Sequence, residues 1–138
     1  MVYQIVYSSI SRKVMNSDSI FELLTKAQAF NKEHGITGLL IYHSSVFLQL
    51  LEGEEKEVKE LYQKILKDPR HSDMLILLEA KSETRLFDIW SMAYKKIEDI
   101  TPELLGELIQ VTKEISKNKK LSDSSKMMKL LKQFRFQM

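Results

Sequence analysis

Two amide side chains stand at positions where the sequence pattern predicts a hydrophobic interior. Helical steps from Ile20 lead through apolar positions to Asn31, which therefore falls on the buried stripe of a predicted helix. Gln49 shares one face of a predicted strand with Phe47 and Leu51. A buried amide costs about 1–3 kcal/mol unless it is hydrogen-bonded. Two such amides on neighbouring elements favour a shared polar partner, such as a flat heteroaromatic ligand with N–H and C=O edges.

A tyrosine on the first predicted strand is the third polar residue of this kind. Tyr7 shares a strand face with Tyr3 and Ile5, so its side chain is also predicted to point inward. Each of the three polar residues has an ordinary structural interpretation when taken alone: a satisfied core asparagine, a capped glutamine or a half-buried tyrosine. Taken together, they favour a ligand cleft.

Other kinds of chemistry find little support in the residues. The three histidines, His34, His43 and His71, are scattered without the spacing of a metal site, and we expect no bound metal. Cysteine is absent, which excludes disulfides, thiolate nucleophiles and thiolate metal ligands. With only four glycines, the chain has no glycine-rich run to cradle a phosphate, and nothing resembles a hydrolase triad.

The elements that must position these residues alternate along the chain. We predict a strand over 2–9, a helix over 19–34, strands over 36–42 and 46–51, a helix over 54–67, and strands over 74–80 and 85–94. Ser19 and Glu22 match a capping box for the first helix, and Gly35 follows that helix where a left-handed residue is expected. The order β-α-β-β-α-β-β predicts an α+β, ferredoxin-like sheet with both helices on one face.

Two further helices are predicted near the C-terminus, over 102–115 and 122–134, and we expect them to cover the other face of the sheet. Residues 1–112 carry a net charge of −4 and residues 113–138 a net charge of +6. A basic tail can bind nucleic acid, but we favour a solvated helix face here, because the tail has only two aromatic residues for base stacking. No apolar run is long enough to span a membrane and no secretory signal is recognisable, so we expect a cytoplasmic protein.

Several segments of the chain resemble those of one known protein family. The segments 35–42 (GITGLLIY), 47–49 (FLQ) and 51–53 (LEG) resemble the core motif of BLUF domains, the blue-light sensors that use FAD. Tyr7, Asn31, the stretch 68–71 (DPRH) and the stretch 85–92 (RLFDIWSM) are similar to further landmarks of the family. The resemblance implies a flavin-binding domain over 1–97 and a C-terminal helical extension over 98–138.

The resemblance also implies a mechanism. Asn31 would bind the carbonyl and imide edge of the flavin, and Gln49 would bridge the flavin to Tyr7. Under blue light Tyr7 would give an electron and, through Gln49, a proton, and both would then return. Gln49 would remain rearranged, by rotation or by tautomer change, and the absorption spectrum would shift to the red. Trp90 or Met92 would pass the change on, with an ordinary packing role as the alternative for each.

The resemblance to BLUF domains implies further cofactor-binding residues. Phe30 would pack beside the flavin ring, and Lys64, Arg70 and His71 suit the phosphates of FAD by charge and location, with Asp68 in the same stretch. FAD is the expected cofactor, with FMN and riboflavin left open. We expect a light sensor without enzymatic turnover, a homo-oligomer, and a downstream protein partner of unknown identity. We expect no nucleic acid and no membrane as partners.

Two other functions stay open from the residues. One is a ferredoxin-like ligand-binding regulatory module without photochemistry, which the colour and light response of the purified protein would distinguish. The other is a small ferredoxin-like hydrolase, although the chain offers it no clear nucleophile.

Overall fold

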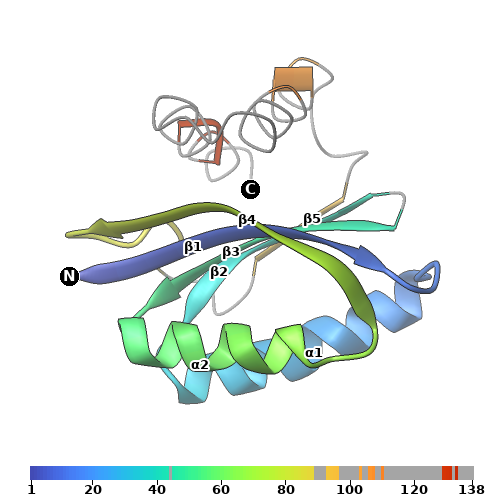
Figure 1. Ribbon diagram of the computed structural model, residues 1–138, viewed down its shortest axis with the longest axis horizontal. Coiled ribbons are helices and arrows are strands. Elements are labelled where there is room, and N and C mark those ends of the chain that lie inside the picture. The colour runs from blue at the N-terminus through green and yellow to red at the C-terminus, as the bar shows by residue number, and fades with distance from the viewer. Residues whose placement is uncertain are drawn as a thin grey trace.

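A five-stranded sheet with two helices on one face forms the body of the protein (Figure 1). The computed structural model describes residues 1–43, 45–88, 93–96, 103, 106, 107, 110, 129–131 and 133. The elements are β1 (Val2–Ser11), α1 (Ser17–Glu33), β2 (Thr37–His43), β3 (Val46–Gly53), α2 (Glu55–Leu66), β4 (His71–Ser82) and β5 (Ala93–Lys96). The strand order is β4-β1-β3-β2-β5, and all neighbours are antiparallel except β2 and β5. The predicted ferredoxin-like α+β fold is confirmed.

Alternation along the central strands produces a hydrophobic core on each face of the sheet. Toward the helices, the buried residues of β1 are Tyr3, Ile5 and Tyr7, and they pack with residues of α1 and α2 such as Ile20 and Val58. The other face is lined by a second set: Val6, Leu39, Ile41, Leu50, Leu77 and Leu78. Because β1, β2 and β3 are apolar on both faces, they occupy internal positions of the sheet.

The first helix begins earlier than the sequence predicted. Asn16 is its N-cap, with an extended backbone and a side-chain oxygen that accepts a hydrogen bond from the Ser19 amide at 2.8 Å. The predicted capping box at Ser19 is therefore wrong, because a competing cap residue lies three positions upstream. The other end agrees with the prediction. Gly35 has a φ of +66°, and the Ile36 amide donates to the Asn31 carbonyl at 2.8 Å, which closes the helix.

The predicted strand over 85–94 is the main difference from expectation. Residues 85–88 form no strand, and β5 contains only Ala93–Lys96. Leu86 and Phe87 give the segment its strand-like apolarity, but both are buried against the second face of the sheet. Residues 89–92, including Trp90 and Met92, lie outside the described residues.

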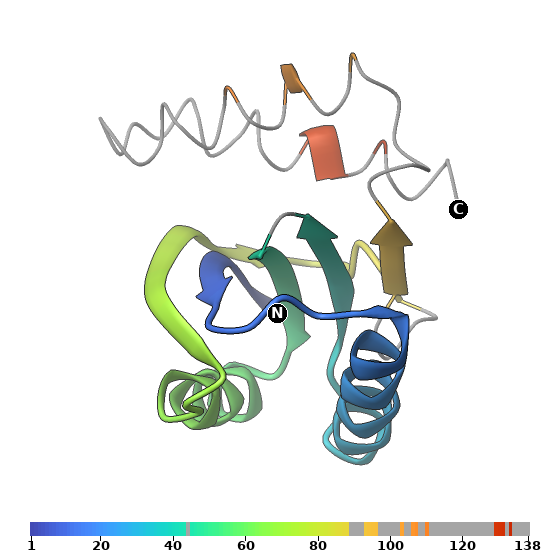
Figure 2. The same cartoon turned by 90° about the vertical axis from the view of Figure 1, so that its right-hand side faces the viewer.

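Part of the C-terminal region can be placed on the second face (Figure 2). Leu130 and Leu131 are helical and buried, and they belong to the same hydrophobic cluster as Leu50, Leu86 and Phe87. Residues 103, 106, 107 and 110 are helical and exposed. The remaining parts of the predicted helices over 102–115 and 122–134 lie outside the described residues.

Candidate functional site

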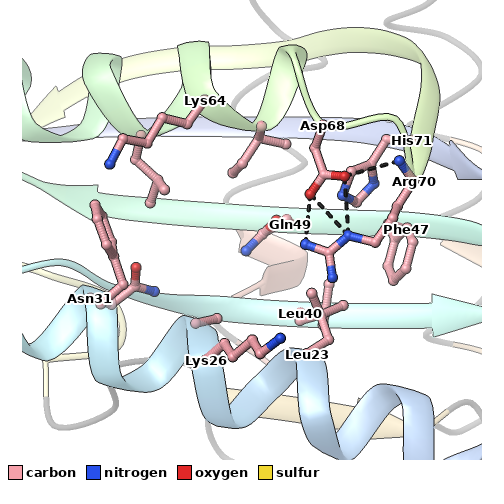
Figure 3. A pocket seen from close by; sticks show the side chains of 14 residues that line it. Leu23, Lys26, Asn31, Leu40, Phe47, Gln49, Lys64, Asp68, Arg70 and His71 are labelled. Carbon is pink, nitrogen blue, oxygen red and sulfur yellow. Dashed lines mark hydrogen bonds and ion pairs between the residues drawn. The ribbon is translucent and has the colours of Figure 1, made fainter.

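A pocket of about 230 Å³ opens between α1 and α2, with the sheet as its floor (Figure 3). Its lining residues are Leu23, Lys26, Ala27, Phe30, Asn31, Leu40, Phe47, Gln49, Leu61, Lys64, Ile65, Asp68, Arg70 and His71. Of the cofactor-binding residues predicted from the sequence, all but Tyr7 line this pocket. Tyr7 lies directly beneath it, because it is hydrogen-bonded to Gln49.

At the floor of the pocket, Gln49 is hydrogen-bonded to a tyrosine on the adjacent strand. The β1–β3 register places Tyr7 opposite Gln49, and the Tyr7 hydroxyl donates a hydrogen bond to Oε1 of Gln49. Tyr7 is completely buried, and its ring meets the Tyr62 ring of α2 edge-on at 5.2 Å. Burial, with a smaller contribution from Tyr62, raises the pKa of Tyr7 well above its usual value. Tyr7 therefore stays protonated at any physiological pH and acts as the donor in this pair.

Asn31 reaches the pocket from the end of α1. Its side chain is only 1% exposed although it borders the cavity, and the closing turn of the helix fixes its backbone. A side-chain amide both donates and accepts hydrogen bonds. Asn31 and Gln49 therefore present two amides to the same space from different elements, as the pattern of polar residues among apolar ones predicted.

One end of the pocket is closed by groups from both helices. The Phe30 ring of α1 stacks on the His34 ring at 4.1 Å, and Lys64 Nζ of α2 lies 4.5 Å from the centre of the Phe30 ring. Nδ1 of His34 is 2.9 Å from a carboxylate oxygen of Glu57, which joins α1 to α2. The walls of this end are thus held by one ring stack, one cation–π contact and one histidine–glutamate hydrogen bond.

Charged groups gather at the other end. The Arg70 guanidinium forms a forked pair with the Asp68 carboxylate, with contacts of 2.6 and 3.0 Å, and this bond lowers the pKa of Asp68. His71 is partly buried, within 3.3 Å of the Ser9 hydroxyl, and burial lowers its pKa. With Lys26 and Lys64 also lining the pocket, the surroundings favour an anionic or phosphorylated ligand.

Several lining residues were missed by the sequence analysis. Lys26 is one, together with an apolar set: Leu23, Ala27, Leu40, Phe47, Leu61 and Ile65. A signal for Lys26 existed in the sequence. It lies on the same helical stripe as Leu23 and Phe30.

The described part of the chain offers neither a metal site nor a membrane-spanning helix. There, no group of three or more histidine or acidic residues could hold a metal ion. Among the same residues, no helix is both long enough and apolar enough to cross a membrane.

The fold and pocket together define a ferredoxin-like domain with a ligand cleft between its helices, and comparison with known proteins identifies its class. The family model described as sensors of blue-light using FAD, BLUF, matches residues 2–93. The chain therefore belongs to the BLUF family. The family resemblance found in the sequence is confirmed, and with it the class of flavin-using blue-light sensors.

Individual relatives agree with this assignment. The blue light- and temperature-regulated antirepressor BluF of Escherichia coli (strain K12) is 36% identical over 87 residues, which cover 63% of this chain and 22% of BluF. The photoactivated adenylate cyclase subunit alpha of Euglena gracilis is 30% identical over 103 residues, covering 73% of this chain and 10% of that subunit. The chain thus matches only a small part of these longer proteins.

A solved structure resembles almost the whole chain. The photo-activated state of BlsA superposes with a TM-score of 0.74 at 27% identity, and the match covers 95% of each chain. The similarity therefore extends past the end of the family match at residue 93.

Proposed function

We propose that this chain is a blue-light photoreceptor that binds FAD non-covalently and signals through contact with another protein, without catalytic turnover. The hydrogen bond between Tyr7 and Gln49 under the interhelical pocket is the observation that carries the proposal. It joins a buried phenol to an amide that borders the ligand space, which is the arrangement a light-driven transfer of an electron and a proton requires.

The residues present fit a flavin in chemistry and in shape. The pocket is bounded by apolar side chains from two helices, so a flat ring system can be held between them. Asn31 and Gln49 offer donors and acceptors to the polar edge of such a ring, and Phe30 offers an aromatic surface. When bound, a flavin excited by blue light supplies a strong oxidant.

Tyr7 is the proposed electron donor. A buried phenol cannot release a proton to solvent, and its raised pKa disfavours loss of the proton alone. Tyr7 therefore gives up its electron together with its proton, and the proton leaves through the hydrogen bond to Oε1 of Gln49. Both return to Tyr7 afterwards, so the cycle causes no net oxidation.

Gln49 stores the effect of light. Its amide has one accepting and one donating end, so a rotated or tautomeric amide presents different atoms to Tyr7 and to the ligand. In the proposed lit state, the Gln49 amide would make a stronger hydrogen bond to the carbonyl edge of a bound flavin, and the absorption would shift to the red. Such a switch changes polar contacts and leaves all covalent bonds of the resting protein intact.

The choice of FAD rests on the basic groups that line the pocket. Lys64 lies beside Phe30 at one end, and Arg70 and His71 line the other end. We propose that they hold the phosphates and that Asp68 orients Arg70 for this contact. The cysteine-free chain suits the reducing cytoplasm, which we propose as its location.

The absorption spectrum of the purified, flavin-loaded protein before and after blue light tests the proposal. We expect a yellow protein whose spectrum shifts to the red under blue light and recovers in the dark. A colourless protein that does not take up FAD would contradict the proposal. A yellow protein without any light response would instead support a ligand-binding module that lacks photochemistry. Titration with FAD, FMN and riboflavin separates the cofactors, and we expect the tightest binding for FAD.

A further inference from the structure

Glu52 is a fully buried carboxylate on the face of β3 opposite the pocket. Its Oε1 accepts hydrogen bonds from Nε2 of Gln4 at 2.7 Å and from the Leu86 amide at 2.6 Å. Its Oε2 accepts a hydrogen bond from the Phe87 amide at 2.9 Å. One side chain of the central strand therefore joins β1 to the chain segment that follows β4.

All three partners of this carboxylate are donors, which makes its chemistry specific. A glutamine at position 52 would turn one acceptor into an NH2 group facing an N–H, so at least one of the three bonds would be lost. The side chain of Arg85 reinforces the attachment, because its Nη1 lies 3.1 Å from Oγ1 of Thr37 and 3.3 Å from the Glu52 carbonyl oxygen. The segment 85–87 is thus tied to β2 and β3, and through Glu52 to Gln4.

The attached segment forms part of the surface on which the C-terminal region packs. Leu86 and Phe87 are buried in one hydrophobic cluster with Leu130 and Leu131. Leu50 of β3 belongs to the same cluster and stands between Gln49 and Glu52 in the sequence. The strand that carries the pocket amide on one face therefore shares a hydrophobic cluster with the C-terminal leucines on the other.

We propose that Glu52 is the positioning residue that couples the rearrangement of Gln49 to the C-terminal region. Any displacement of β3 at Gln49 is passed to the Leu86 and Phe87 amides by their hydrogen bonds to the buried Glu52 side chain, and from there to Leu130 and Leu131 through the shared hydrophobic cluster. This inference rests on the proposed photoreceptor function. It assigns to Glu52 no role in binding flavin or in the photochemistry.

Hydrogen exchange of the full-length, flavin-loaded protein, measured in the dark and under blue light, tests the coupling. The variants are Glu52→Gln and the matched control Glu60→Gln, which changes an exposed glutamate of α2. In the wild type and the control, we expect light to change exchange at residues 86–87 and 130–131. In Glu52→Gln, we expect an unchanged red shift, dark exchange at these residues faster by about tenfold, and no further change with light.

The outcomes separate this inference from the proposed function. A wild type without a red shift would refute the photoreceptor proposal itself. A wild type with the red shift but constant exchange at these residues would refute the coupling. The coupling would also be refuted if Glu52→Gln kept the full light-induced change in exchange. The same holds if Glu52→Gln folded but lost the red shift. If Glu52→Gln does not fold, Gln4→Met removes one donor and keeps both amide bonds. It should reduce the light-induced change, and a wild-type response would overturn the proposal.

Discussion

Replacing Tyr7 by phenylalanine removes the one hydroxyl on which the proposed photochemistry depends and keeps the buried ring. The ring contact with Tyr62 and the packing with the helix-side core remain, so no apolar area is lost. The change deletes one neutral hydrogen bond to Gln49, which contributes a net of about 1 kcal/mol to the free energy of unfolding. For a chain of 138 residues, this corresponds to a decrease in Tm of roughly 3–5 °C.

The effect on light sensitivity should be complete. A phenyl ring has no hydroxyl proton to pass on with its electron, so we expect Tyr7→Phe to bind flavin and to show no red shift. Thermal unfolding and light-minus-dark absorption are measured on the same sample. Tyr62→Phe is the matched control, because its ring lies 5.2 Å from Tyr7 and it leaves the Tyr7–Gln49 bond in place. A normal red shift in Tyr7→Phe, or its loss in Tyr62→Phe alone, would show that the donor is misassigned.

Four further substitutions probe the pocket, the sheet that supports it and the turn after α1. Asn31→Ala should weaken flavin binding by roughly 5- to 100-fold, as expected for a lost buried amide contact, and a fluorescence titration with an unchanged dissociation constant would argue against its role. Gly38→Ala should abolish cooperative unfolding, because a Cβ at this position would lie 2.0 Å from the Leu50 carbonyl oxygen. Gly35 has a φ of +66° and open space around it, so Gly35→Ala should lower the free energy of unfolding by only about 1–2 kcal/mol. Burial lowers the pKa of His71, so folded His71 stays neutral where the unfolded chain takes up a proton, and the free energy of unfolding should fall as the pH drops below about 6.5. Denaturant titrations at pH 7.5 and 5.5 should show a smaller decrease in His71→Asn than in the wild type.

The polar residues of the pocket were predictable because they interrupt regular patterns. Asn31 lies on an apolar helical stripe and Gln49 on an apolar strand face, so both were expected to point inward, and both line the pocket. The hydrogen bond of Tyr7 to Gln49 needed the strand register as well. In the structure, the pairing of β1 with β3 places Tyr7 directly opposite Gln49.

Other features depend on contacts that are remote in the sequence. The strand-like pattern of residues 85–88 reflects burial of Leu86 and Phe87 against the second face of the sheet, where no ladder pairing is needed. Glu52 looks like a surface residue at the end of a strand, and its burial depends on amides more than thirty residues away. Local propensity does not contain such information, because the partner that compensates a buried charge is chosen by the tertiary fold.

The light-minus-dark infrared spectrum of the flavin-loaded protein tests the central claim most directly. If light is stored as a stronger hydrogen bond from Gln49, the stretching band of the flavin carbonyl should move to lower frequency under blue light and return in the dark. The same band should stay fixed in Gln49→Leu, which keeps the volume and removes the amide. A red-shifted absorption without any movement of the carbonyl band, or an unaltered response in Gln49→Leu, would contradict the account.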